Sequence, residues 1–97
     1  MVAKCYHFFR AIATKLKLDI ISILEEKPMC VSDLSANLNQ ERSKVSHALL
    51  SMQHCGFVES SKNGRNVVYS LNNDTIKPML NLVNNHIKKY CHDCGGA

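Results

Sequence analysis

The first third of the chain carries apolar residues spaced three and four positions apart, which is the period of an amphipathic helix. Thr14 lies within this pattern and suits a helix N-cap, and Pro28 follows it where a helix is expected to end. The pattern therefore predicts two helices, one on each side of Thr14. Their apolar positions are Phe9, Ile12, Leu16, Ile20, Ile23 and Leu24.

Two further helices are predicted in the middle of the chain, separated by a brief polar turn over residues 39–41. The shorter helix covers residues 31–39, and Ser32 is expected to cap it. The longer helix covers residues 42–56 and ends at Gly56, because glycine tolerates the left-handed conformation found at helix ends. The apolar positions expected to face inward are Leu34, Leu38, Val45, Leu49 and Met52.

The spacing changes after Gly56, where residues 57–60 and 66–71 form short strand-like runs. Asn63-Gly64 lies between them and is a strong hairpin signal, because the tight turn needs positive φ. A last helix follows, with Pro78 in its first turn, where a missing N–H costs little. Its apolar residues are Ile76, Met79, Leu80, Val83, Ile87 and Tyr90.

The predicted order is four helices, a β-hairpin and a last helix, which makes the chain mainly α. A short helix, a tight turn, a longer helix and then a hairpin describe a winged helix-turn-helix. The 97 residues suffice for one domain, so residues 1–97 are expected to form a single unit.

The amino-acid composition says less about fold and function than the pattern of apolar positions does. Hydrophobic residues are 45% and charged residues 21% of the chain, and the net charge of +4 is compatible with a nucleic-acid partner. No apolar run approaches the ~18 residues needed to cross a bilayer, and the N-terminus lacks a signal-peptide core. We therefore expect a cytoplasmic protein without a membrane partner. There, five cysteines indicate metal or redox chemistry, or small buried side chains, before disulfides.

Residues 8–90 also resemble the ArsR/SmtB family of small dimeric repressors. The resemblance is carried by "CVSDL" (30–34), "SKVSHALLSMQHCGFV" (43–58) and "KNGRNVVYSL" (62–71). The chain departs from the family in having "AIAT" (11–14) where many members have Ser-Asp-Pro, and Ala48-Leu49 where His-Leu is usual. The resemblance implies a transcriptional repressor that binds a near-palindromic operator in double-stranded DNA.

The polar and basic residues around the predicted helix-turn-helix suit DNA contacts. In such motifs the N-terminal half of the second helix enters the major groove, and flanking residues hold phosphates. The wing hairpin suits the backbone or the minor groove. The predicted DNA-binding residues are Arg42, Ser43, Lys44, Ser46 and His47 on the helix, and Lys62, Asn63 and Arg65 in the wing.

A homodimer is expected as well, because a single module reads only a few base pairs and two-fold dimers match near-palindromic sites. The apolar stripe of the last helix is long for a 97-residue monomer to bury. In the family, this helix pairs with the first helix and with its two-fold mate. Dimerisation helices are therefore expected at both ends of the domain.

Family members sense ions at several alternative sites, and not all of them fit these residues. The zinc-type site on the last helix falls on Asn73, Thr75 and Lys89, so only His86 survives and the site is excluded. The Cys-x-Cys site before the helix-turn-helix is reduced to Cys30. A second candidate metal site therefore joins Cys30 to Cys5 and His7 of the N-terminal segment. Cys55 is expected to be a buried apolar residue.

The preferred candidate site is the C-terminal tail. Cys91 and Cys94 have a two-ligand spacing used for soft metals, and His92 adds another donor. One such pair cannot complete a site, so Cys5 and His7 are the expected partners, from the same chain or its mate. The predicted effector is a soft metal or metalloid ion: Cu(I), Zn, Cd or As(III).

Other functions remain open from the sequence. The same cysteines, Cys91 and Cys94 or one of them with Cys5, could form a disulfide, which would make the protein a redox-sensing repressor. A winged helix that binds protein instead of DNA is a further alternative. An enzyme is not expected, because the chain has neither a phosphate-cradling glycine loop nor paired carboxylates.

Overall fold

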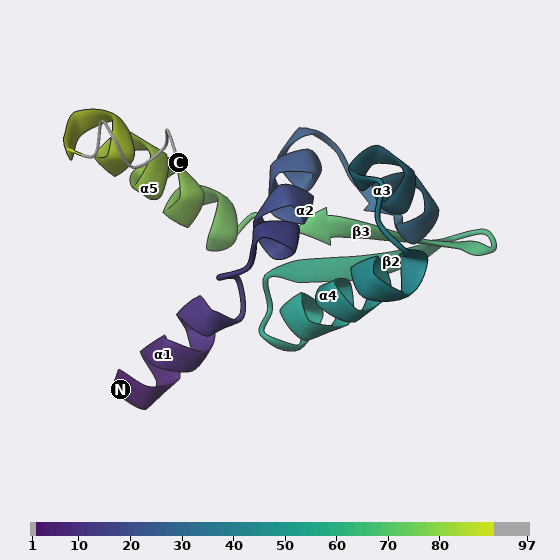
Figure 1. Ribbon diagram of the computed structural model, residues 1–97, viewed down its shortest axis with the longest axis horizontal. Coiled ribbons are helices and arrows are strands. Elements are labelled where there is room, and N and C mark those ends of the chain that lie inside the picture. The colour runs from purple at the N-terminus through teal and green to yellow at the C-terminus, as the bar shows by residue number, and fades with distance from the viewer. Residues whose placement is uncertain (1, 91–97) are drawn as a thin grey trace.

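The computed structural model describes residues 2–90, which form five helices and a small antiparallel sheet (Figure 1). The helices are α1 (Val2–Arg10), α2 (Lys15–Glu26), α3 (Val31–Leu38), α4 (Arg42–His54) and α5 (Ile76–Tyr90). The strands are β1 (Met29–Cys30), β2 (Val58–Asn63) and β3 (Asn66–Leu71). The predicted winged helix-turn-helix is confirmed, with α3 and α4 as the helix pair and β2–β3 as the wing.

The helix ends depend on both local and distant contacts. Thr14 caps α2 as predicted, because its side chain accepts a hydrogen bond from the Lys17 backbone N–H at 3.2 Å. Ser32 does not cap α3, so that prediction was wrong. Cys30 occupies the N-cap position without a side-chain bond, since its pairing in β1 holds it extended. Asn39 ends α3 in the left-handed region, with φ of 53°.

The sheet has the order β1-β3-β2, and all its pairs are antiparallel. The pattern did not predict β1, because two residues show no alternation and its partner strand is about forty positions away. The hairpin is confirmed, but its register pairs Asn63 with Asn66, so the turn residues are Gly64 and Arg65. Gly64 has φ of +68°, as a type II′ turn requires at its first central position.

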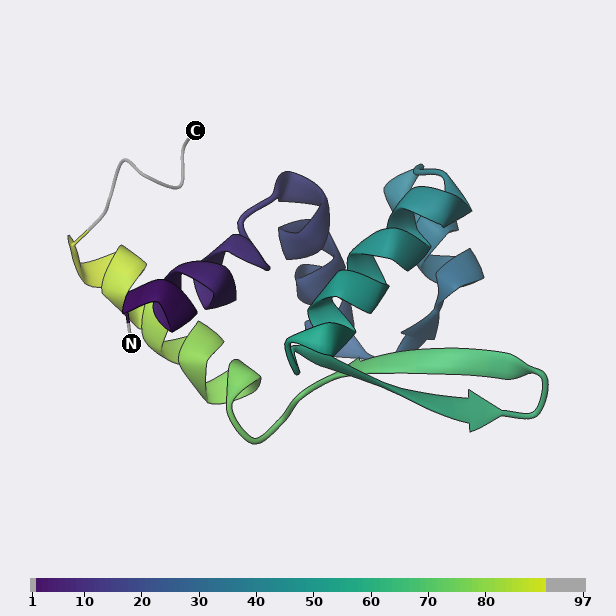
Figure 2. The ribbon, with the colours of Figure 1, turned by 90° about the horizontal axis from the view of Figure 1, so that it is seen from below.

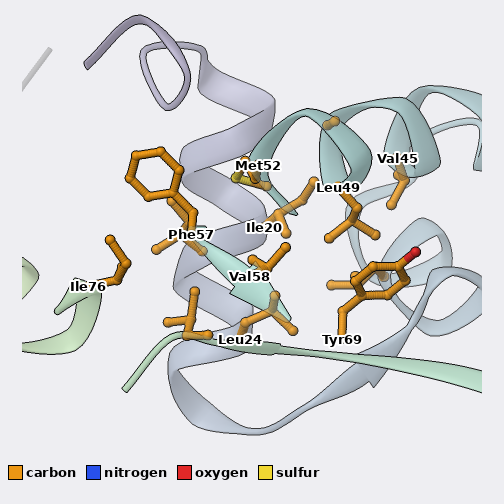
Figure 3. Close-up of a cluster of buried hydrophobic side chains, with 13 residues drawn as sticks. Ile20, Leu24, Val45, Leu49, Met52, Phe57, Val58, Tyr69 and Ile76 are labelled. Carbon is orange, nitrogen blue, oxygen red and sulfur yellow. The ribbon is translucent and has the colours of Figure 1, made fainter. Parts of the chain in front are cut away.

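The hydrophobic core lies between α2, α3 and α4 on one side and the sheet on the other (Figure 3). Ile20, Leu49 and Phe57 are fully buried there. Ile20 lies on α2, Leu49 on α4 and Phe57 shortly after α4, so the core joins α4 to the scaffold that carries it. Its other members are Ile21, Leu24, Leu34, Val45, Ala48, Met52, Val58, Tyr69, Leu71 and Ile76.

The first and last helices extend from one side of this body, opposite the tip of the wing (Figures 1 and 2). In Figure 1 they diverge, with α1 below and α5 above, and neither makes an extended contact with another element. The expectation that they lie together is therefore not met within one chain. None of the described helices is long and apolar enough to span a membrane.

Candidate nucleic-acid interface

The second helix of the helix-turn-helix, α4, has two opposite faces. Val45 and Leu49 point into the core, together with Ala48 and Met52. Positions three and four residues apart on the other side of the helix are exposed. We call these the outward stripe, which consists of Ser43, His47, Leu50 and His54. The stripe covers the length of α4, so the helix can lie in a groove while its other face holds it to the scaffold.

Contacts from α3 and the preceding turn hold the start of α4 in place. The Arg42 guanidinium donates a hydrogen bond to Ser32 Oγ, which ties α4 to the first turn of α3. Ser35 Oγ donates to the Gln40 carbonyl and braces the turn between the two helices. Arg42 is exposed beyond this contact, so it can both position the helix and approach a phosphate.

The remaining predicted residues of α4 are placed differently around it. Ser43 and His47 lie on the outward stripe, and Ser46 is half-buried beside it. Lys44 is exposed on the flank of α4, where it lines a shallow hollow with Lys15 and Gln40. This position favours contact with a strand flanking the groove over contact with a base edge.

The predicted wing residues Lys62, Asn63 and Arg65 are all exposed at the tip of the β2–β3 hairpin. Figure 2 shows this tip extending well beyond the body of the domain. Gln53 Nε2 donates to Ser60 Oγ at 2.9 Å, which links α4 to the wing strand. This hydrogen bond joins the wing to the recognition helix.

The basic residues of this surface have no acidic partners. Among the described residues, the one salt bridge joins Lys15 Nζ and Asp19 at 2.9 Å. Arg42, Lys44, Lys62 and Arg65 therefore present uncompensated positive charge around α4 and the wing. Such charge attracts a phosphate backbone, because binding releases the counterions condensed on DNA.

Leu50 was missed by the sequence analysis, which considered only polar residues as DNA contacts. It is 56% exposed in the middle of the outward stripe, between His47 and His54. The available signal was its spacing, because Leu50 lies three residues after His47 and four before His54 and so shares their side of the helix. An exposed apolar side chain here suits contact with a thymine methyl group.

The candidate metal ligands are dispersed in the described part of the chain. Cys5 and His7 are exposed on α1, whereas Cys30 is half-buried at the start of α3. The helices α1 and α3 lie on opposite sides of the domain (Figure 1). Residues 2–90 contain no cluster of three or more His, Cys, Asp or Glu side chains able to hold a metal. The predicted ligands Cys91, His92 and Cys94 lie outside the described residues.

Cys55 is exposed, so the prediction that it is buried was wrong. The helical period would place residue 55 below Met52 on the core side. However, α4 ends at His54, and the chain folds back so that the Phe57 N–H bonds the Met52 carbonyl at 2.9 Å. Phe57 fills the core position, and Cys55 is left at the surface.

Comparison with known proteins also indicates a regulatory protein with this fold. The profile described as bacterial regulatory protein, arsR family, matches residues 14–60. The chain is 33% identical over 82 residues to the transcriptional repressor SmtB homologue of Synechocystis sp., covering 84% of this chain and 62% of that protein. It is 35% identical over 71 residues to the regulator NmtR of Mycobacterium tuberculosis, covering 73% and 59%.

A cadmium resistance transcriptional regulatory protein, CadC of Listeria innocua, is 29% identical over 76 residues, covering 77% of this chain and 64% of that protein. The chain thus spans less than two thirds of the length of these three curated relatives. Each is named as a transcriptional regulator, which agrees with the expectation that the chain is not an enzyme.

Solved structures agree with the fold. The apo-NmtR structure has a TM-score of 0.76 at 30% identity, covering 93% of this chain and 76% of that one. HlyU from Vibrio cholerae also has a TM-score of 0.76, at 28% identity, covering 93% and 95%. A homodimeric winged helix-turn-helix DNA-binding domain, Mb0332 from Mycobacterium bovis, has a TM-score of 0.83 at 17% identity, covering 93% and 83%, and shows the fold alone.

The buried face of α4, its exposed outward stripe and the basic wing define a winged helix-turn-helix protein with a surface suited to nucleic acid. Within that class, the chain belongs to the ArsR family of bacterial regulatory proteins.

Proposed function

We propose that the protein is a DNA-binding transcriptional regulator, most simply a repressor, that binds a near-palindromic operator as a homodimer. The observation that carries the proposal is the exposed stripe of α4 flanked by four basic side chains without acidic partners. Ser43, Ser46, His47 and Leu50 would contact base edges. Arg42, Lys44, Lys62, Asn63 and Arg65 would contact phosphates, as suits the predicted roles of the wing and the helix flank.

Arg65→Ala tests the wing contact. The substitution should weaken binding to duplex DNA at every sequence, and it should reduce the slope of log K against log salt by about one, because one phosphate contact is lost. Lys44→Ala should also weaken binding and reduce the salt slope by about one, because it removes a phosphate contact on the flank of α4. Fluorescence anisotropy with a selected operator, measured from low to high salt, gives both quantities.

The matched control is Lys27→Ala, which removes the same charge from an exposed residue beyond the end of α2. We expect the control to keep the wild-type salt slope. If Arg65→Ala and Lys44→Ala also keep it while remaining folded, the proposed docking of α4 and the wing is wrong. If the wild-type protein binds no duplex at low salt, the alternative of a protein-interaction module gains support.

The proposed dimer would use the exposed apolar side chains of the two terminal helices. Tyr6 and Phe9 on α1 and Val83 and Tyr90 on α5 are exposed, at 60%, 58%, 45% and 72%. Apolar side chains of this size rarely remain exposed together on the terminal helices of a monomer. A second copy of the chain would bury them and bring two α4 helices onto one face of the DNA.

We further propose that a soft metal or metalloid ion, bound by cysteine thiolates, controls DNA binding. Cys91, His92 and Cys94 are the proposed core of the site, with Cys5 and His7 as partners from either chain. The exposure of Cys5 and His7 leaves them available for this role. A coupling of ~1–3 kcal/mol between ion and DNA would be enough for strong derepression.

A cadmium titration of the reduced protein tests the tail site. The wild type should develop thiolate-to-metal ultraviolet absorption, and Cys91→Ser/Cys94→Ser should lose most of it. Cys55→Ser serves as the control, because Cys55 is an exposed thiol that belongs to neither candidate site. We expect this control to absorb like the wild type.

Two other outcomes would change the assignment. Absorption that survives the tail substitutions but disappears in Cys30→Ser would move the ion to the second candidate site of Cys5, His7 and Cys30. Absence of absorption in the wild type would contradict the metal proposal. A reversible disulfide formed with peroxide, accompanied by a change in DNA affinity, would then support the redox alternative.

A further inference from the structure

A hollow of about 630 Å³ lies where α1, the start of α2 and the end of α4 meet. His7 and Arg10 line it from α1, and Lys17 lines it from α2. Ser51 and His54 complete it from α4. Its volume is that of a small-molecule site, and it connects the helix proposed for dimerisation to the helix proposed for DNA recognition.

The hollow is positively charged, because its lining includes Arg10 and Lys17 but no aspartate or glutamate. Lys17 is half-buried, and its ammonium group has only a neutral partner, Ser51 Oγ at 3.2 Å. No described carboxylate forms a salt bridge with Arg10 or Lys17. Both cationic side chains would attract a bound anion.

The helix ends around the hollow do not all act in the same direction. The hollow includes Thr14, the N-cap of the 12-residue helix α2, whose side chain accepts the Lys17 N–H. The positive end of the α2 dipole favours an anion there, whereas α1 and α4 present their C-terminal ends to the hollow. The preference for an anion therefore rests on the side chains of Arg10 and Lys17.

A metal ion fits this hollow poorly. His7, His54 and Cys55 line it, but they do not form a cluster able to hold a metal among the described residues. Arg10 and Lys17 would also repel a cation. The chemistry of the lining thus favours an oxyanion, a phosphate or a carboxylate, over the soft metal proposed for the cysteine sites.

We propose that this hollow is an anion-binding site that accepts a phosphate or carboxylate group. The group could belong to a small organic anion or to the operator backbone, because His54 lies both in the hollow and at the end of the outward stripe. Binding of the anion does not depend on the proposed function. The effect of that binding on regulation does rest on the proposed function, since an anion held between α1 and α4 would couple the dimer helices to DNA recognition.

The test uses inorganic phosphate as the probe, followed by NMR shifts of backbone amides at matched ionic strength in sodium chloride. The wild type should show saturable shifts at Lys17, Ser51 and His54. Lys17→Gln should bind phosphate about tenfold more weakly or worse, since a charge-assisted hydrogen bond is lost.

Lys15→Gln is the matched control. It removes the same charge two residues away, but Lys15 is outside this hollow and is paired with Asp19. We expect it to bind phosphate like the wild type. Shifts that do not saturate, that chloride reproduces, or that weaken equally in both variants would overturn the proposal.

Measurements of DNA binding then distinguish the two sources of the anion. If the operator supplies the phosphate, Lys17→Gln but not Lys27→Gln should reduce the salt slope by about one. If the anion is a free small molecule, both variants should keep the wild-type slope. If the wild-type protein binds phosphate but not DNA, the anion site is supported and only the proposed function is contradicted.

Discussion

A Phe57→Ala variant is expected to lose about 3–5 kcal/mol of unfolding free energy, which is a large share of the 5–15 kcal/mol typical of a domain. Phe57 is fully buried directly after α4, and its ring lies 4.8 Å from that of Phe8, centroid to centroid. The substitution would leave a cavity in the core and would also remove a contact that holds α1 to the body. Urea unfolding at one fixed protein concentration measures the loss.

Leu18→Ala is a suitable control, because Leu18 is 46% exposed on α2. The control should change the unfolding free energy by less than about 1 kcal/mol, since little apolar surface returns to water. A Phe57→Ala variant as stable as this control would show that the junction between α4 and β2 does not depend on the core as the structure indicates.

An Ile87→Glu variant is expected to be mainly monomeric at micromolar concentration and to bind its operator about a thousandfold more weakly. Ile87 lies on the apolar stripe of α5 and is partly exposed in the single chain. In the proposed dimer each copy would place an unpaired carboxylate in an apolar interface, at a cost of about 3–5 kcal/mol per copy. Analytical ultracentrifugation and anisotropy measure the two effects.

The control for this variant is Asn85→Glu, which adds the same charge to the opposite, polar face of α5. It should remain dimeric and should bind DNA with an affinity close to that of the wild type. Circular dichroism checks that both variants are folded. If Ile87→Glu is dimeric and binds DNA with unchanged affinity, the proposed interface is wrong and the dimer must form through other surfaces.

The sequence was most informative where structure depends on neighbours along the chain. The three-and-four spacing of apolar residues predicted all five helices, and the Thr14 cap is a contact to Lys17, three residues away. The hairpin also followed from local turn chemistry, although its turn is displaced by one residue to Gly64 and Arg65. Such features are visible in a sequence because the groups that stabilise them are only a few positions apart.

The candidate DNA interface was predictable to a similar extent. Of the residues predicted to contact DNA, all are exposed except the half-buried Ser46, because those of α4 lie away from its core face and those of the wing lie at the hairpin tip. Leu50 was missed because only polar residues were considered as DNA contacts, although its spacing places it with His47 and His54. The proposed metal tail lies outside the described residues and stays a prediction.

The sequence by itself therefore determined the order of the five helices and the hairpin, the inward faces of α2, α3 and α4, and the family. Only the tertiary structure decided what Cys30, Ser32 and Cys55 do: β1 pairing places Cys30 at a helix cap, Ser32 bonds Arg42, and Cys55 is exposed. It also brought Arg10, Lys17 and His54 around one hollow. The reason is physical, because these arrangements depend on contacts between segments ten to forty residues apart, which no local pattern records.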